Sequence, residues 1–135
     1  LASQSKLFCE FFGTKRSLFK DEAHTRACLK NTIENHILFV AERTDVGLVG
    51  FIGGIVMPHI FNPDITCLIE TYWWVAEEYR GTRAGLMLLN EFVEYGKAHT
   101  DWVLMTLESG SPVSDRCLLK RGFQLKEQNY LLEVG

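Results

Sequence analysis

An apolar strand that leads through a glycine-containing turn into a long helix is the feature that most constrains this chain. Residues 65–75 are dense in apolar and aromatic side chains, which is typical of a strand. Residues 82–99 place apolar side chains at helical spacing, which predicts a helix with one buried side. The turn between them contains Gly81. A strand and a helix in this order require a domain in which helices pack against a sheet.

The other predicted elements come in the order helix, helix, strand, strand before this unit and strand, helix, strand after it. Gly13 ends the first helix, Asp21 caps the second, and Ser111 caps the last, with Pro112 at its first helical position. The strand at 102–107 is apolar throughout, so we expect both of its faces to be covered. These elements span about residues 7–12, 22–35, 36–43, 48–57, 102–107, 111–122 and 123–134.

One domain accounts for all of these elements. The 135 residues are enough for a single hydrophobic core, and no linker, repeat or low-complexity segment interrupts them. Helices first, then strands, then an alternation of the two predict an α+β fold over residues 1–135. The glycines of the second strand, Gly50, Gly53 and Gly54, indicate a bulge or the close approach of another backbone.

The turn and the start of the long helix predict a phosphate-binding loop. A strand that enters a helix through a tight turn points several free backbone N–H groups at one place, and the helix dipole adds about half a positive charge there. Such a place binds phosphate or pyrophosphate without needing side-chain cations. Arg80 and Arg83 add charge, while Gly81, Ala84 and Gly85 leave room for a ligand. The segment matches neither the Walker loop nor the dinucleotide-binding fingerprint.

Charge and hydrophobicity exclude two classes of partner. The net charge of −3 is inconsistent with the basic surface that nucleic-acid binding requires. No apolar run approaches the roughly 20 residues that span a bilayer, and the chain shows no signal peptide. We therefore expect a cytoplasmic protein with neither a nucleic-acid nor a membrane partner, and the sequence leaves a homodimer open.

The cysteines and histidines do not indicate a metal site. Cys9, Cys28, Cys67 and Cys117 lie far apart, and the four histidines are equally scattered. Each cysteine lies in an apolar or helical stretch, where a buried free thiol is typical. We therefore expect no metal, no disulfide and a reducing compartment.

The loop and its flanks resemble the GNAT superfamily of N-acetyltransferases. Arg80-Gly-Thr-Arg-Ala-Gly85 is similar to the coenzyme A signature Gln/Arg-x-x-Gly-x-Gly/Ala. Val75-Ala-Glu-Glu-Tyr-Arg-Gly81 is similar to the lead-in Val-x-Pro-Glu-Tyr-Arg-Gly. Leu118-Leu-Lys-Arg-Gly-Phe123 resembles the ending Tyr-x-Lys-x-Gly-Phe of the family's late helix. The order of elements also agrees over residues 36–134.

The resemblance implies a mixed, mostly antiparallel sheet flanked by helices and splayed between the strand ending near Val75 and the strand starting near Trp102. It also implies acetyl-CoA as cosubstrate and transfer of its acetyl group to a primary amine on a small molecule or a peptide. The pantetheine arm would pair with backbone groups of Trp73 and Val75 like an added strand. Ser111 stands where the family often has Asn. The pyrophosphate would lie on Arg80, Gly81, Thr82, Arg83, Ala84 and Gly85.

Three positions depart from the family's pattern. Arg83 replaces a Gly, which is tolerable because a residue at the start of a helix has a negative φ and its N–H still serves. Glu77 replaces a Pro, which is a minor change. Leu118 replaces the Tyr that often protonates the leaving thiolate. Water, a serine or Tyr130 on the last strand must then supply that proton, or the thiolate leaves as the anion.

Glu70 is the candidate general base. It is a carboxylate inside an otherwise apolar strand, and such burial is costly enough to suggest a purpose. Burial would raise its pKa toward the range useful for taking a proton near neutral pH. A solvated, idle Glu at a frayed or edge position is an equally weighted alternative. The family has a bulge near the end of this strand, which would decide whether Glu70, Thr71 or Tyr72 faces the acceptor.

Two other classes of function stay open. A non-catalytic acyl-CoA-binding or sensing module would suit the missing Tyr, and a structural domain that lost its ligand would keep only the fold. The sequence does not identify the acceptor amine. We expect its site to include the early helices and the loop at 58–64, where the resemblance is weakest.

Overall fold

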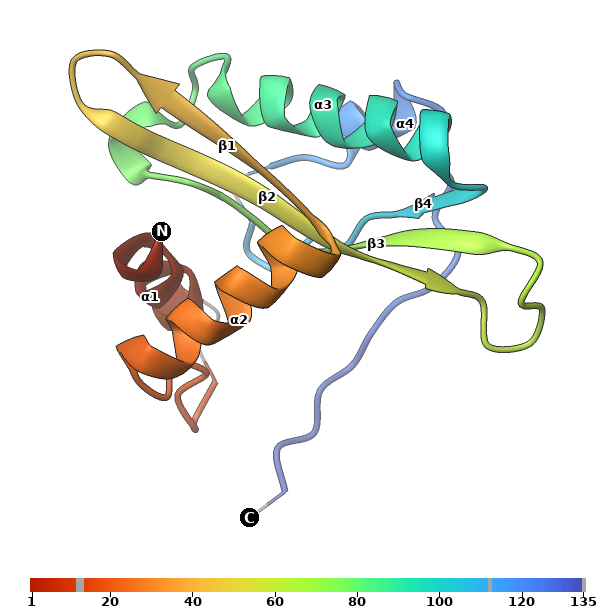
Figure 1. Ribbon diagram of the computed structural model, residues 1–135, viewed down its shortest axis with the longest axis horizontal. Helices are drawn as coiled ribbons and strands as arrows, with labels where there is room; N and C mark the ends of the chain where they lie inside the picture. The colour runs from red at the N-terminus through yellow and green to blue at the C-terminus, as the bar shows by residue number, and fades with distance from the viewer. Residues whose placement is uncertain (12–13, 112, 135) are drawn as a thin grey trace.

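A four-stranded sheet in the order β1-β2-β3-β4 forms the centre of the computed structural model (Figure 1). The first three strands pair antiparallel, and β4 runs parallel to β3. The structure describes residues 1–11, 14–111 and 113–134. The strands are β1 (Ile37–Arg43), β2 (Gly47–Pro58), β3 (Thr66–Val75) and β4 (Trp102–Leu104). The helices are α1 (Ala2–Phe11), α2 (Glu22–Asn35), α3 (Ala84–His99) and α4 (Arg116–Leu119), with a 3-10 turn η1 at Glu77–Tyr79.

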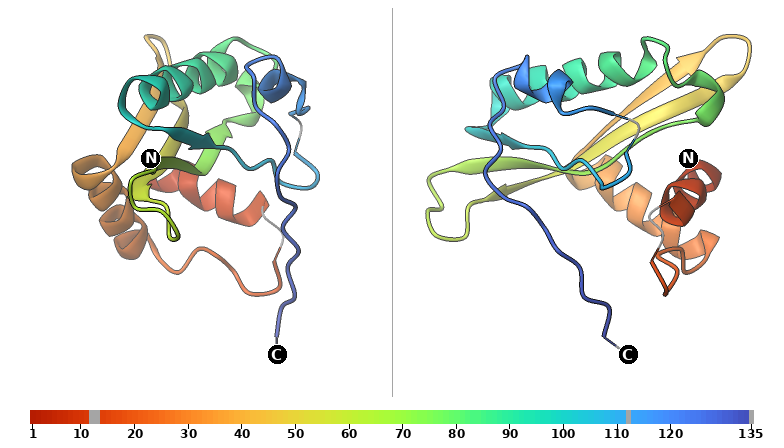
Figure 2. Two further views of the ribbon diagram at one scale, coloured as in Figure 1. Left: turned by 90° about the vertical axis from the view of Figure 1, so that its right-hand side faces the viewer. Right: turned by 180° about the vertical axis from the view of Figure 1, so that it is seen from behind.

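Helices cover both faces of this sheet, which confirms the expected α+β fold. α3 lies along one face, and α1 and α2 lie on the other (Figures 1 and 2). Because successive strand residues point to opposite faces, Trp73 packs toward α3 while Trp74 packs toward α1. The core under α3 fixes β2 and β3 relative to that helix, and its centre consists of Ile52, Leu68, Leu88 and Phe92, each at most 3% exposed.

The elements from α2 to α3 lie close to their predicted positions. Asp21 caps α2 as expected, because its Oδ1 accepts the N–H of His24 at 2.7 Å. α3 begins at Ala84, slightly later than predicted. All four cysteines are free, but Cys28 is exposed on α2, so the expectation that every thiol is buried is wrong. The predicted helix end at Gly13 lies outside the described residues.

A bulge in β3 lies beside the glycines of β2, as the sequence predicts. Gly53 pairs with Tyr72 and Gly54 pairs with Glu70, so Thr71 has no partner across the two strands. The Thr71 hydroxyl instead donates to the Gly53 carbonyl at 3.1 Å. A Cβ on Gly54 would lie 2.8 Å from the Phe92 ring. Only a glycine at this position therefore lets the ring of Phe92 pack so close to β2.

β4 is shorter and more exposed than predicted. It pairs with β3 over three residue pairs, the last of which joins Ile69 to Leu104. Trp102 is 47% exposed and Leu104 is 41% exposed, so the expectation that both faces are covered is wrong. β4 lies at the edge of the sheet, and α3 covers only the face that carries Val103.

The end of the chain also differs from the prediction. The last helix begins at Arg116, so Ser111 does not cap it, and Pro112 lies outside the described residues. The described residues from 123 to 134 form no strand; they extend away from the sheet in Figure 1, and most of their side chains are exposed. A strand requires a partner for its backbone, and here this segment has none within the described chain.

The packing of α3 on the sheet at Gly96 generates a prediction. A Cβ at Gly96 would collide with Val103 of β4 and would lie 3.2 Å from Leu68. We expect Gly96→Ala to lower the free energy of unfolding by about 1–3 kcal/mol, although alanine is the better helix former. Urea unfolding monitored by circular dichroism measures this change.

Gly85→Ala is the matched control on the same helix. A Cβ there would lie 3.6 Å from Val75, which is an ordinary van der Waals contact. We expect its stability to equal or slightly exceed that of the wild type. A Gly96→Ala protein as stable as Gly85→Ala would contradict the proposed close packing.

Candidate active site

A cleft opens where β3 and β4 separate. The two strands pair only as far as Ile69 and Leu104, and beyond this point β3 continues to Val75 paired with β2 alone. The resulting cleft has a volume of about 530 Å³ and lies between the end of β3 and the segment from 106 to 113. The expected splay of the sheet is therefore present, and it creates a space of ligand size.

The cleft gathers most of the residues that the sequence predicts for the site. Arg83 and Ala84 lie at the start of α3 beside the cleft but do not line it. The predicted residues that do line it are Glu70, Trp73, Val75, Arg80, Gly81, Thr82, Gly85 and Ser111.

The backbone of β3 presents a free edge to this cleft. The Ala76 N–H donates to the Val49 carbonyl at 2.8 Å, so Ala76 directs its backbone groups toward β2. Backbone groups alternate in direction along an antiparallel strand, so those of Val75 and Trp73 point toward the cleft. The Val75 carbonyl accepts a hydrogen bond from Arg80 Nε at 3.0 Å. An extended ligand could therefore pair along this edge.

The loop before α3 carries several unused N–H groups. Gly81 has a φ of +83°, which a glycine adopts without strain and which turns the chain toward the helix. Arg83 has a φ of −73° directly before α3, so its side chain is tolerated there as expected. No acceptor among the described residues takes the N–H groups of Gly81, Arg83, Gly85 and Leu86. Together with the helix dipole, these N–H groups have the arrangement that can hold an anion.

Arg80 connects this loop to α1. Its guanidinium lies 4.5 Å from the centre of the Trp74 ring and 5.8 Å from the centre of the Phe11 ring. The same side chain donates to the Val75 carbonyl. Arg80 is thus held by aromatic rings and a carbonyl, and no carboxylate in the described chain forms an ion pair with it.

Glu70 lies at the point where the sheet opens. It is half-buried and pairs with Gly54 of β2. A Cβ built on Gly54 would point at Phe92 of α3, and paired residues on neighbouring strands share a face, so the Glu70 side chain also lies on the α3 side. Burial away from water raises the pKa of the Glu70 carboxyl to about 8. Glu108 lines the same cleft, and burial raises the pKa of that carboxyl too. Glu70 is therefore a half-buried carboxyl with a raised pKa and not the solvated carboxylate of the alternative interpretation.

An aromatic wall closes the cleft on the α1 side. Phe8 of α1 stands edge-on to Tyr72 and Trp74, with ring centres 6.3 and 6.2 Å apart. Phe11 meets Trp74 in the same manner at 6.0 Å. From the sequence, Phe8 and Phe11 belong only to the predicted helix at about 7–12, because their spacing does not indicate which strand they contact.

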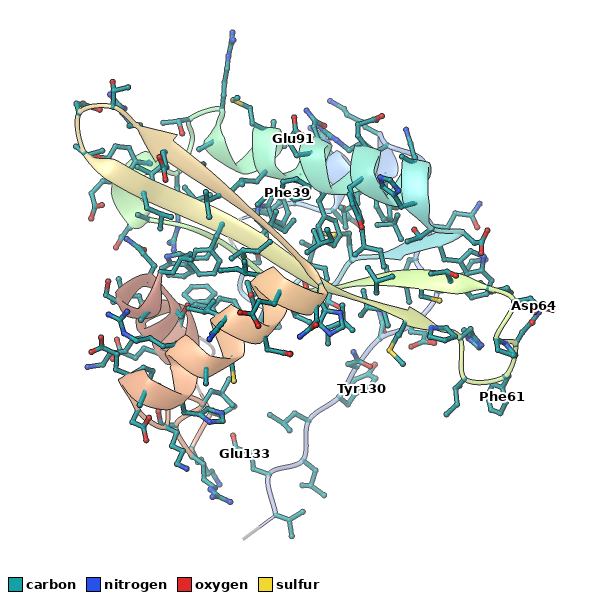
Figure 3. All side chains as sticks on the ribbon, viewed as in Figure 1. Phe39, Phe61, Asp64, Glu91, Tyr130 and Glu133 are labelled. Carbon is teal, nitrogen blue, oxygen red and sulfur yellow. The ribbon has the colours of Figure 1, made fainter. Side chains whose placement is uncertain are left out.

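Two other expected positions lie elsewhere. Tyr130 is 89% exposed on the C-terminal segment, far from α3 in Figure 3, because the strand that would carry it does not form. Leu118 is buried against Leu89 and Val93 of α3 and does not line the cleft.

The β2–β3 loop, with Phe61 at its tip in Figure 3, lies at the far end of β3 and takes no part in the cleft. The loop at 58–64 therefore does not line this cleft, and its part in the acceptor site stays a prediction.

Glu108 and Thr106 of the cleft were not predicted from the sequence. They follow β4 in a segment without regular structure, and they line the same cleft as Glu70 because the strands separate there. Within the described residues, no cluster of His, Cys, Asp and Glu has the composition to hold a metal ion. In the same part of the chain, every helix is too short or too polar to cross a membrane.

The sequence matches the Acetyltransferase (GNAT) family over residues 4–123. No curated protein matches it significantly. A crystal structure of a probable acetyltransferase has a TM-score of 0.76 and 18% identity, covering 99% of this chain and 89% of its own. The crystal structure of a predicted acetyltransferase with acetyl-CoA from Clostridium acetobutylicum has a TM-score of 0.72 and 15% identity, covering 98% of this chain and 86% of its own. The crystal structure of glucosamine-6-phosphate N-acetyltransferase from Arabidopsis thaliana has a TM-score of 0.70 and 11% identity, covering 100% of this chain and 95% of its own. The structural matches show the shared fold.

The raised pKa of Glu70 predicts how stability depends on pH. Between the ordinary pKa of 4.5 and the value of about 8, the folded protein holds a proton that the unfolded chain releases. The free energy of unfolding therefore falls as pH rises through this range. Glu70→Gln removes this ionisation, so the variant should not lose stability through it as pH rises. The melting temperature of Glu70→Gln minus that of the wild type should therefore be larger at pH 9 than at pH 5, by on the order of 5 °C.

Glu127→Gln, on the exposed C-terminal segment, is the control for a general effect of charge. Its melting temperature relative to the wild type should stay constant over the same pH range. Differential scanning fluorimetry measures all three proteins. A constant difference for Glu70→Gln would contradict the burial of an ionisable Glu70.

Proposed function

This chain belongs to the GNAT acetyltransferase family, and from that premise we propose that it transfers the acetyl group of acetyl-CoA to a primary amine. The observation that carries the proposal is a single cleft that joins a loop of free N–H groups to a half-buried carboxylate. The loop would bind the pyrophosphate, and the carboxylate would take a proton from the amine.

The α3 side of the cleft fits acetyl-CoA, which supplies an acetyl group activated as a thioester. The N–H groups of Gly81, Arg83 and Gly85 would hold the pyrophosphate, with Arg80 close enough to add charge. The free edge of β3 at Trp73 and Val75 would pair with the amides of the pantetheine arm. Arg80 would have to release the Val75 carbonyl for that pairing. The Clostridium acetobutylicum acetyltransferase with acetyl-CoA supports the same cosubstrate here.

Glu70 would act as the general base. Its carboxylate accepts a proton from the amine, directly or through one water, and so frees the nitrogen lone pair for direct attack. The Val75 N–H points into the cleft and would stabilise negative charge that develops on the acetyl oxygen. The chain needs no nucleophilic side chain to carry the acetyl group.

The proton for the leaving thiolate has fewer candidates than the sequence suggested. Tyr130 lies outside the cleft, whereas Ser111 lines it. Water or Ser111 would supply the proton, or the thiolate would leave as the anion. A non-catalytic acyl-CoA-binding module is the second candidate function, favoured by the burial of Leu118 at the position of the family's Tyr. Release of free thiol from acetyl-CoA in the presence of amines separates the two.

The phosphate site yields a prediction about which residues matter. We expect Gly85→Leu to weaken coenzyme A binding more than Arg83→Ala, because the backbone carries the contact and a larger side chain at position 85 would enter the cleft beside Trp73. Titration calorimetry with coenzyme A measures both affinities. The opposite ranking would show that side-chain charge, and not the backbone, holds the pyrophosphate.

The role of Glu70 yields a second prediction. Glu70→Gln keeps the shape of the side chain but cannot accept a proton, so kcat should fall by about 10²–10⁴-fold with little change in acetyl-CoA affinity. The wild-type kcat/KM should rise with pH through a group near 8, because only the ionised carboxylate is a base. Thiol release recorded from pH 6 to pH 9 tests both effects. Near-normal turnover of Glu70→Gln would rule out this role.

A further inference from the structure

The cleft passes between the two faces of the sheet. Trp73, Val75 and Gly85 belong to the α3 side, where the loop for acetyl-CoA lies. The β3 bulge at Thr71 shifts the alternation of the strand, so the next residue, Tyr72, turns to the α1 side together with Trp74. With the α3 side assigned to acetyl-CoA under the proposed function, the α1 side remains for the acceptor.

The surface on the α1 side is aromatic. Phe8, Phe11, Tyr72 and Trp74 line it, and their rings meet edge to face at 6.0–6.3 Å between α1 and β3. A flat apolar group extends such an arrangement by one more ring contact. Arg80 closes one end of this wall, where it lies over Trp74 and Phe11, which leaves the rings of Phe8 and Tyr72 at the other end.

The ionisable groups that line the cleft suit a cation better than an anion. Glu70 and Glu108 are its two carboxyl groups, and an ammonium group beside them would favour their ionised form. Arg80 is the single cationic side chain that lines the cleft within the described residues. Arg80 is already held by the Val75 carbonyl and two rings. A phosphate or carboxylate on the acceptor would therefore face two acidic groups. This arrangement does not suit a sugar phosphate, the kind of molecule in the name of the Arabidopsis thaliana neighbour.

We infer that the acceptor is a primary amine with one positive charge and a flat apolar group, as in the arylalkylamines. This inference rests on the proposed function. The ammonium group lies toward Glu70 and Glu108, and the flat group packs against Phe8 and Tyr72. A polyamine fits less well because it has no flat apolar group to bury against the aromatic wall.

The first test compares amines of different character on the full chain with saturating acetyl-CoA. The series is 2-phenylethylamine, propylamine, spermidine and glucosamine 6-phosphate, and the readout is kcat/KM from thiol release. We expect 2-phenylethylamine to exceed each of the others by about 10-fold or more, because burial of a ring distinguishes it from propylamine. Equal values for 2-phenylethylamine and propylamine, or a preference for spermidine or the sugar phosphate, would overturn the inference.

A pair of variants on α1 connects that preference to the aromatic wall. Phe8→Leu keeps an apolar side chain but loses the flat ring, so the ratio of kcat/KM for 2-phenylethylamine over propylamine should fall by about 3-fold or more. Leu7→Ala is the matched control, since Leu7 is the neighbouring residue, is 48% exposed and does not line the cleft. It should keep the wild-type ratio. A thermal shift with coenzyme A verifies that both variants are folded. An unchanged ratio in Phe8→Leu would contradict the assigned wall.

A binding measurement separates this inference from the proposed function. If no amine releases thiol, the proposed transfer is wrong, and titration calorimetry of 2-phenylethylamine against the protein with coenzyme A still tests the cleft. Binding that Phe8→Leu weakens and Leu7→Ala does not would support the aromatic amine site. The absence of binding would overturn it.

Discussion

The separation of β3 from β4 is the constraint on which the rest of this structure depends. Three residue pairs hold the two parallel strands together, and the pairing ends at Ile69 and Leu104. Beyond that point β3 keeps one edge paired with β2 and leaves the other edge open. A sheet edge with free N–H and C=O groups requires a partner, either solvent or a ligand. The open edge therefore gives an otherwise packed sheet a place where a ligand can pair.

The bulge at Thr71 determines what this opening contains. On one side of it Glu70 remains paired with Gly54, and on the other side Tyr72 pairs with Gly53. The extra residue keeps Glu70 on the α3 side while it sends Tyr72 and Trp74 to α1. A carboxylate and an aromatic wall thus lie within a few residues of each other on opposite faces. The glycines of β2 allow this arrangement because they leave room for the rings of Tyr72 and Phe92.

Burial gives Glu70 its chemistry. Most of the sheet core is apolar, and a carboxyl placed against it holds its proton to about pH 8. The same desolvation that weakens the folded protein at high pH brings this group into the range where it can exchange protons near neutrality. Stability and reactivity at this position therefore have one physical cause.

The sequence by itself determined the helices and strands from Asp21 to His99, because capping, periodicity and turn chemistry are local. It also singled out the turn before α3 and the carboxyl of Glu70 as the candidate site residues. It did not determine the contact of Phe8 with β3, the presence of Glu108 in the same cleft as Glu70, or the absence of a strand in the described residues from 123 to 134. These depend on which distant segments pack together. An apolar stripe shows that a face is buried but not against what, and an apolar segment becomes a strand only where a partner edge lies beside it. Tertiary structure alone decided those contacts.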